Sequence, residues 1–240
     1  MTQVSPDAQV LIATQTKGFY EGFNPWVAAV PKVIIAALLI WVASSPNAAG
    51  AQLLALQSWS TASFAPWYML VTAFLTLACL GLALWPGTGR LVLCKAGETP
   101  EFSRFPWLSM MFGAGIGVGM LTYSTAEPIF HFTTNPETIQ GLAQSQDADN
   151  VRNAYKWALL HYGLTPWACY GIVGMALGYL SYAKDMPLTI RSGLQPIFGR
   201  RLSGWLGHLV DIAAILATLI GLGVTIGYGV SQFAAGLFNI

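Results

Sequence analysis

Long apolar segments are the feature of this sequence that most limits its possible folds. Of its 240 residues, 55% are apolar and only 9% are charged, and the mean hydropathy is +0.56. A soluble domain usually carries about 25% charged residues, so this chain has few charges with which to cover a water-facing surface. The sequence therefore predicts an all-α integral membrane protein with the lipid bilayer as its solvent.

Five segments are apolar enough to cross a bilayer as helices, because a span needs about 20 mostly apolar residues. We expect transmembrane helices near residues 26–45, 66–86, 106–127, 155–182 and 207–238. Gly and Pro interrupt the last three, and the last two are long enough to tilt or to extend past the membrane surface. Residues 1–25 are expected to form a polar tail and residues 26–240 a transmembrane domain.

Basic residues are distributed unevenly between the predicted connections. Of the eleven Lys and Arg residues, nine are expected on the side of the N-terminus, and only Arg152 and Lys156 on the other. The nine are Lys17, Lys32, Arg90, Lys95, Arg104, Lys184, Arg191, Arg200 and Arg201. Cytoplasmic loops carry this excess, so we expect a multi-pass protein of the plasma membrane with a cytoplasmic N-terminus. The net charge of +1 argues against a nucleic-acid partner.

Two predicted connections are long enough to contain structure of their own. Residues 133–154 are polar and are expected to form an external loop with one or two helical turns. Residues 184–206 mix apolar side chains with basic ones, which fits either an interfacial helix resting on anionic lipid or a plain solvated linker.

Four glycines alternate along the third predicted helix, at Gly113, Gly115, Gly117 and Gly119. Each costs about 1 kcal/mol of helix propensity relative to Ala, so the run weakens the helix by about 3–4 kcal/mol. One interpretation is close helix packing, since residues four apart form two GxxxG pairs. The other is an interrupted helix whose freed backbone groups line a site for a substrate and an ion. The spacing alone does not decide between them.

Three aromatic residues, Tyr162, Trp167 and Tyr170, occur close together in the fourth predicted helix. In a continuous helix the rotation of 100° per residue would place all three on one side. Such rings are common in membrane helices as packing or interfacial residues. The alternative is an aromatic cage, whose ring faces would attract a quaternary ammonium through cation–π contacts worth about 2 kcal/mol or more.

Glu127 and Asp211 carry charge inside or near predicted helices. Each fits an interfacial position, and at greater depth each would need a partner and become a functional candidate. We expect Asp211 at the level of the lipid headgroups. The histidines, His131, His161 and His208, show no HExxH spacing, and G-x-S-x-G and Walker motifs are absent from the sequence. We therefore expect no enzymatic activity, no resident cofactor and no metal centre.

Several ordered blocks of the sequence resemble the betaine/choline/carnitine transporter family. They are residues 100–104, the glycine run 113–119, Ala126-Glu127-Pro128, residues 161–194 and residues 211–219. The resemblance covers roughly residues 20–240 and implies a twelve-helix, LeuT-like fold whose core is two inverted five-helix repeats. The implied function is secondary transport of quaternary-ammonium solutes such as glycine betaine, choline or carnitine, for example in osmolyte uptake.

The resemblance also implies roles for the glycine run. The run matches the unwound part of the family's helix, where Gly115, Gly117 and Gly119 would border the substrate. The backbone carbonyls of Gly113 and Ile116 would offer an ion site.

Side-chain roles follow from the same resemblance. Tyr162, Trp167 and Tyr170 match the aromatic cage, although many relatives have Trp at the position of Tyr162. Thr218 matches a hydroxyl in a sodium site of sodium-coupled members. Those members carry a second hydroxyl one turn later, where this chain has Leu222, which cannot coordinate a hard cation. Coupling to Na+, coupling to H+ and exchange therefore all stay open.

The match to the family is incomplete. The tryptophan-rich eighth helix, which completes the cage, and the whole second repeat have no counterpart among the 240 residues. We expect either a truncated piece of a longer transporter or an assembly with a second polypeptide, and family members commonly form trimers. The alternative is a non-transporting membrane scaffold or regulatory fragment whose glycines only pack helices.

Overall fold

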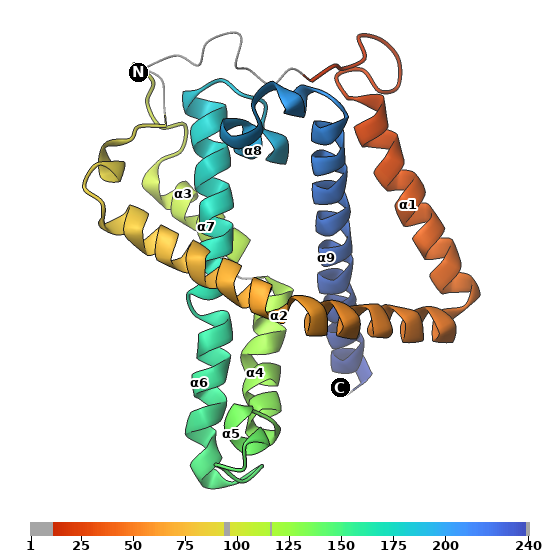
Figure 1. The fold of residues 1–240 in the computed structure, drawn as a ribbon, viewed down its shortest axis with the longest axis vertical. Coiled ribbons are helices and arrows are strands. Elements are labelled where there is room, and N and C mark those ends of the chain that lie inside the picture. The colour runs from red at the N-terminus through yellow and green to blue at the C-terminus, as the bar shows by residue number, and fades with distance from the viewer. Residues whose placement is uncertain (1–11, 94–96, 116, 239–240) are drawn as a thin grey trace. The chain divides into compact units, whose positions relative to one another are not determined.

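The computed structural model describes residues 12–93, 97–115 and 117–238, and helices form nearly all of their regular structure (Figure 1). The all-α prediction is confirmed. The α-helices are α1 (Pro25–Ser44), α2 (Pro46–Leu84), α3 (Arg104–Gly115), α4 (Val118–Thr133), α5 (Pro136–Ile139), α6 (Val151–Tyr162), α7 (Thr165–Gly178), α8 (Ile190–Phe198) and α9 (Trp205–Phe238). Short 3₁₀ turns lie at Thr88–Arg90, Ala148–Asn150 and Gly199–Ser203, and a π-helical turn at Tyr179–Ala183 follows α7.

Three helices within the described residues, α1, α2 and α9, are each long and apolar enough to cross a membrane. The bounds of α1 and α9 lie within two residues of the predicted starts and ends at 26–45 and 207–238. The start of α1 is capped by Asn24, whose Oδ1 accepts hydrogen bonds from the backbone N–H groups of Trp26 and Val27 at 3.1 and 3.2 Å. Pro25 at the first helical position lacks an N–H that would otherwise have no partner.

The second helix is much longer than predicted. Residues 46–65 were expected to connect two spans, but α2 runs without interruption through 39 residues from Pro46 to Leu84. Pro46 is favourable at a helix start, and the Ala, Leu and Gln residues that follow have high helix propensity. Pro66, interpreted as the beginning of a span, lies inside the helix, where a proline removes one hydrogen bond and need not end the helix.

The other two predicted spans are each divided into two helices. The segment 106–127 is shared by α3 and α4, which are separated at Gly117. The segment 155–182 is shared by α6, α7 and the π-helical turn, with a break at residues 163–164. The two expected helical turns in the external loop are present as α5 and the 3₁₀ turn at Ala148–Asn150.

The chain forms two compact units. The first comprises residues up to 96 together with residues 170–219, and the second comprises residues 97–169 and 220–240. In the first unit, Leu180, Met186 and Leu202 form a small buried core. Residues 184–206, expected to form an interfacial helix or a linker, contain the short helix α8. In the second unit, α4 and α6 lie side by side, and α5 lies at one end of this pair (Figure 1).

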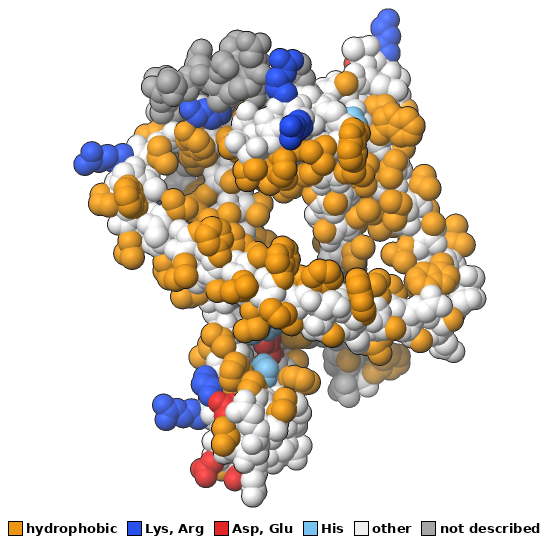
Figure 2. All heavy atoms as spheres, in the orientation of Figure 1, with side chains coloured by type: hydrophobic (Ala, Val, Ile, Leu, Met, Phe, Trp, Pro, Cys, Tyr) orange, Lys and Arg blue, Asp and Glu red, His pale blue; other side chains and the backbone are white. Residues whose placement is uncertain are grey.

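Large apolar side chains face outward along the long helices. Leu39 and Ile40 of α1 and Met69 and Leu70 of α2 are each more than 60% exposed. Figure 2 shows hydrophobic side chains covering the visible face of α1 and α2, while charged side chains gather over α5 and the start of α6. Apolar surface on this scale is suited to lipid or to further protein and not to water.

Candidate functional site

The glycine run interrupts the predicted third span. Gly115 is the last residue of α3, and Gly117 caps α4 with an extended backbone at φ −94° and ψ 166°. Gly119 lies in the first turn of α4, and Gly113 lies in the last turns of α3. Ile116, the expected contributor of a carbonyl, lies outside the described residues. The predicted break in the helix is therefore confirmed, whereas ligand binding by these residues stays a prediction.

Among the described residues, no neighbouring segment packs against Gly113, Gly117 or Gly119. A Cβ atom added to Gly113, Gly117 or Gly119 would meet no atom within 4 Å, apart from its chain neighbours and its own helix backbone. A GxxxG contact instead places a neighbouring helix directly against the glycines. The interruption itself explains why glycine is used, because each glycine weakens the helical ladder at the point where α3 ends.

The three candidate rings do not lie on one continuous helix. Tyr162 is the last residue of α6, while Trp167 and Tyr170 lie in α7. The prediction that a uniform rotation of 100° per residue places them on one side is therefore wrong. Tyr162 and Trp167 belong to the second unit and Tyr170 to the first. Trp167 is 41% exposed and Tyr170 is 77% exposed in the described chain.

The break after α6 has a local cause that the sequence contains. Pro166 lacks the N–H that would continue the helix by bonding to the carbonyl of Tyr162. Gly163 directly follows Tyr162, and its N–H donates to the carbonyl of Leu159 at 2.8 Å. A Cβ atom at Gly163 would lie 2.3 Å from that carbonyl oxygen, so only glycine fits without a shift of the backbone.

Two further tyrosines, which sequence reasoning did not single out, adjoin Tyr162 in the second unit. The ring of Tyr123, from α4, stacks on the ring of Tyr162 with centroids 6.0 Å apart and planes 22° apart. The hydroxyls of Tyr123 and Tyr228, the latter from α9, form a hydrogen bond of 2.7 Å. Tyr123 lies four residues before Glu127 in the sequence. Its neighbour Tyr228 is 105 residues away, and only the fold brings the two tyrosines together.

Glu127 is buried within the described chain, being 7% exposed, and it has the partners that a buried carboxylate needs. Its Oε1 lies 2.5 Å from Nδ1 of His161 in α6 and 3.5 Å from Nε2 of His131 one turn later in α4. The sequence showed the carboxylate and both histidines separately, without metal-ligand spacing. The structure brings them together because α4 and α6 pack against each other.

A polar network ties the C-terminal end of α4 to the N-terminal end of α6. Asn135 and Asn150 are almost completely buried, and Nδ2 of Asn135 donates to Oδ1 of Asn150 at 2.8 Å. Asn150 in turn donates to the carbonyl of Phe132 at 2.8 Å. Because each buried amide is hydrogen-bonded, the loop is anchored to both helices.

The end of α5 is also tied to α6. Glu137 accepts hydrogen bonds from Nζ of Lys156 and from the indole N–H of Trp157. These bonds, that from Lys156 first, hold the pKa of the Glu137 carboxyl below its usual range.

A second buried carboxylate lies in the first unit. Asp211, whose depth at headgroup level stays a prediction, is 7% exposed and paired with Arg191, which is fully buried. Nε of Arg191 donates to Oδ2 of Asp211 at 2.6 Å, and its other nitrogens contact the carbonyl of Leu202 at 3.3 Å and Nδ1 of His208 at 3.0 Å. The partner lies 20 residues earlier in the sequence, in α8, so the pairing follows from the fold.

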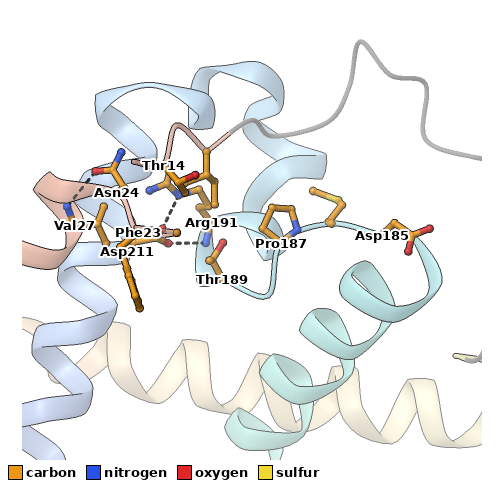
Figure 3. A pocket seen from close by; sticks show the side chains of 12 residues that line it. Thr14, Phe23, Asn24, Val27, Asp185, Pro187, Thr189, Arg191 and Asp211 are labelled. Atoms are coloured by element: carbon orange, nitrogen blue, oxygen red, sulfur yellow. Dashed lines mark hydrogen bonds and ion pairs between the residues drawn. The ribbon is translucent and has the colours of Figure 1, made fainter. Parts of the chain in front are cut away.

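This ion pair borders a cavity of about 550 Å³ beside the N-terminal segment. Figure 3 shows Thr14, Phe23 and Asn24 of the N-terminal segment around it, with Thr189 on the connection before α8 and Arg191 in the first turn of α8. Nδ2 of Asn24 also donates to the carbonyl of Ala13 at 2.7 Å. The side-chain nitrogens of Arg191 are all hydrogen-bonded to Asp211, Leu202 and His208, so the guanidinium has a structural role beside this cavity.

The expected ion ligand on α9 lies within a regular helix. Oγ1 of Thr218 donates to the carbonyl of Ala214 at 2.8 Å, and Leu222 lies one turn later. The hydroxyl oxygen keeps lone pairs with which it can accept a cation, while Leu222 offers none. Among the described residues, no group of three or more His, Cys, Asp or Glu side chains is arranged to hold a metal ion.

Comparison with known proteins gives a consistent match over this region. The family model described as BCCT, betaine/carnitine/choline family transporter, matches residues 26–240. The high-affinity choline transport protein of Escherichia coli K12 is 43% identical over 179 residues, which cover 75% of this chain and 26% of that protein.

Two glycine betaine transporters are also similar. That of Acinetobacter baylyi is 34% identical over 228 residues, covering 93% of this chain and 33% of that protein. Glycine betaine transporter 1 of Vibrio parahaemolyticus is 36% identical over 183 residues, which cover 76% of this chain and 35% of that protein. The chain thus spans about a quarter to a third of the length of these relatives.

Proposed function

Because this chain belongs to the BCCT family of betaine/carnitine/choline transporters, we propose that it forms part of a secondary transporter of quaternary-ammonium solutes such as choline, glycine betaine or carnitine. One observation carries the proposal: the chain interrupts its membrane helix at Gly117. Backbone groups left without partners cost several kcal/mol in lipid, and membrane proteins retain them where they line a cavity. Transport requires no chemical step, and we propose none.

We assign the substrate site to both broken helices. Gly115, Gly117 and Gly119 would allow the solute to approach the backbone, and Tyr162, Trp167 and Tyr170 would supply ring faces. A quaternary ammonium cannot donate an N–H hydrogen bond, so cation–π attraction to these rings is the interaction best suited to it. The glycine betaine and choline transporters among the relatives support this substrate class.

The coupling ion would be Na+ or H+. Backbone carbonyls at Gly113 and Ile116 are the proposed ligands of one ion site, and Thr218 of a sodium site, since a hard cation prefers oxygen. Leu222 lies where the site of Thr218 would need a second hydroxyl, which argues against coupling to two sodium ions and leaves one sodium ion, a proton or exchange. We place the protein in the plasma membrane with a cytoplasmic N-terminus, from the distribution of basic residues. Assembly as a homotrimer is proposed from the family resemblance.

Uptake of radiolabelled choline and glycine betaine into proteoliposomes tests the proposal. The intact transporter that contains this chain should accumulate at least one of them. Replacing Trp167 with Ala should weaken apparent affinity about 30-fold, because a desolvated cation–π contact is worth about 2 kcal/mol. Replacing Tyr170 with Ala should act in the same direction, while Trp59→Ala on α2 serves as the matched control.

The outcome separates transport from the alternative of a membrane scaffold. Wild-type levels of uptake in the Trp167→Ala/Tyr170→Ala double variant would reject the aromatic cage. A wild-type protein that binds no quaternary amine and instead copurifies with a stable partner would reject transport in favour of a scaffold.

A further inference from the structure

Glu127 has features that an ordinary structural carboxylate lacks. Its side chain is only 8% exposed and lies in the second half of α4, yet both acid–base partners within 4 Å in the described part of the chain are histidines. Its second oxygen, Oε2, is buried and has no hydrogen-bond partner among the described residues. Nδ1 of His131 is likewise buried and has no hydrogen-bond partner among the described residues. Buried polar atoms without partners are uncommon, and here two of them belong to one cluster.

The short contact between Glu127 and His161 requires a proton. At 2.5 Å, Oε1 of Glu127 and Nδ1 of His161 must share a hydrogen, because neither atom can donate when both are deprotonated. Either the imidazole donates to the carboxylate, or the carboxylic acid donates to the imidazole. With the imidazole as donor, an ionised Glu127 and a neutral His131, the cluster carries a net charge of −1. With the carboxylic acid as donor, His161 keeps its own proton on Nε2 and the cluster is neutral.

A net charge of −1 is unfavourable at a buried site in a membrane protein. One additional proton makes the cluster neutral, either as a carboxylate beside an imidazolium or as a carboxylic acid beside a neutral imidazole. The two partnerless atoms, Oε2 of Glu127 and Nδ1 of His131, give that proton further places to bind. The cluster therefore has both an electrostatic reason and the capacity to take up one proton.

His161 also provides a route to the buried carboxylate. Its side chain is 71% exposed in the described chain, in contrast to Glu127. A proton that binds Nε2 of this imidazole allows the hydrogen on Nδ1 to pass to Oε1 of Glu127, and the imidazole returns to neutrality in its other tautomer. The transfer conserves protons and needs no other reactant.

The cluster lies next to a ring assigned to the substrate. His161 directly precedes Tyr162, the last residue of α6, whose ring stacks on Tyr123 of α4. Tyr228, from α9, is a further titratable residue near the cluster, and its hydroxyl is hydrogen-bonded to that of Tyr123. Because the Glu127–His161 contact joins α4 to α6, a change in its proton number alters the force that holds these two helices and their rings together.

We propose that Glu127, His131 and His161 form a proton-binding site whose occupancy is coupled to solute binding at Tyr162. The coupling rests on the proposed transport function, whereas the proton site itself does not. This coupling would make the proton a co-transported ion if protonation strengthens solute binding, and an exchanged ion if protonation weakens it.

Infrared difference spectroscopy over a pH titration tests the proton site without any solute. As the pH falls, protein reconstituted in lipid should show either the carbonyl stretch of a protonated Glu127 carboxylic acid or the ring band of a His161 imidazolium beside ionised Glu127, and either band shifts in D₂O. Glu127→Gln should remove the first band or move the midpoint of the second, Glu137→Gln should keep either band, and His161→Gln should move the midpoint of the first or remove the second. Identical spectra from wild type and Glu127→Gln would overturn the proposal. Monodisperse elution of each variant in detergent establishes that it is folded.

The pH dependence of choline affinity tests the coupling. Uptake of one linked proton changes the wild-type Kd tenfold per pH unit across the titration range. This slope should vanish in Glu127→Gln and persist in Glu137→Gln. A falling Kd at lower pH indicates co-transport, and a rising Kd indicates exchange. A full slope in Glu127→Gln would overturn the coupling. If wild type bound no quaternary amine at any pH, the proposed function would fail while the infrared band still decided the proton site.

Discussion

Replacing Arg191 with Met should destabilise the first unit severely. The guanidinium is fully buried and contacts Asp211, the carbonyl of Leu202 and His208. Without it, Asp211 remains a buried carboxylate with no cation beside it in this cluster. Breaking a buried pair in this way costs about 3–5 kcal/mol. That corresponds to about a 200- to 5,000-fold reduction in the equilibrium constant for folding, since about 1.4 kcal/mol is tenfold.

A second substitution distinguishes an ion pair from simple packing. Once Arg191 is Met, converting Asp211 to Leu removes the stranded charge and replaces it with apolar volume. Buried pairs replaced on both sides by apolar residues are often no less stable than the original pair. The double variant Arg191→Met/Asp211→Leu should therefore recover most of the stability lost by the single variant.

Denaturant titration in mixed micelles, followed by tryptophan fluorescence, measures these differences. Arg201→Met is the matched control, because Arg201 lies on the same connection and is exposed. An exposed arginine contributes about 0–1 kcal/mol, so this variant should resemble wild type. The reasoning is wrong if Arg191→Met loses no more stability than Arg201→Met. It is also wrong if the double variant Arg191→Met/Asp211→Leu is no more stable than Arg191→Met.

Three further predictions concern the second unit and α7. Hydrogen bonds lower the pKa of Glu137, so their contribution to loop stability is complete above the unfolded carboxyl's pKa. It is lost as the pH falls through the folded value. Glu137→Gln should remove this pH dependence of amide hydrogen exchange, and Lys156→Met should reduce it, because the hydrogen bond from Trp157 remains. Gly163→Ala brings a Cβ atom to 2.3 Å from a backbone oxygen and should cost about 1–3 kcal/mol in denaturant titration. Gly174→Ala, where nothing lies within 4 Å, should not be destabilising. Asn135→Ala removes a helix cap and a buried hydrogen bond, and should cost about 1–2 kcal/mol and accelerate proteolysis of the external loop; an unchanged cleavage rate would contradict this.

Helix existence could be predicted from the sequence because apolar length is a local property. The helices α1 and α9 agree with their predicted ranges. The start of α2 was predicted wrongly because Pro66 was interpreted as the first residue of a span. The helix starts at Pro46, and the helix-forming residues that follow carry it on through Pro66. Hydropathy identifies which residues suit lipid, but it does not reveal where a helix continues beyond the apolar stretch.

The broken helices show the same limit in another form. Alternating glycines weaken a helix enough that a break near Gly117 was foreseeable. The break at Gly163 was not predicted, although Pro166 three residues later was a usable signal. Contacts were harder still: Glu127 and His161 lie 34 residues apart, and no periodicity in the sequence relates them. Such contacts depend on helix packing, which the sequence expresses only through the complete fold.

The second unit combines several features that are each unfavourable in a membrane. Two helix breaks, at Gly117 and Gly163, leave backbone groups outside the regular helical ladder, and Glu127 adds a buried carboxylate with a partnerless oxygen. Each such feature costs on the order of 1 kcal/mol or more, and packing alone would favour their replacement by Ala or Leu. The Glu127–His161 contact joins the helix that follows the first break to the helix that precedes the second. A solute that displaces the helices at either break must therefore strain this contact, and the proton that holds the contact together must respond.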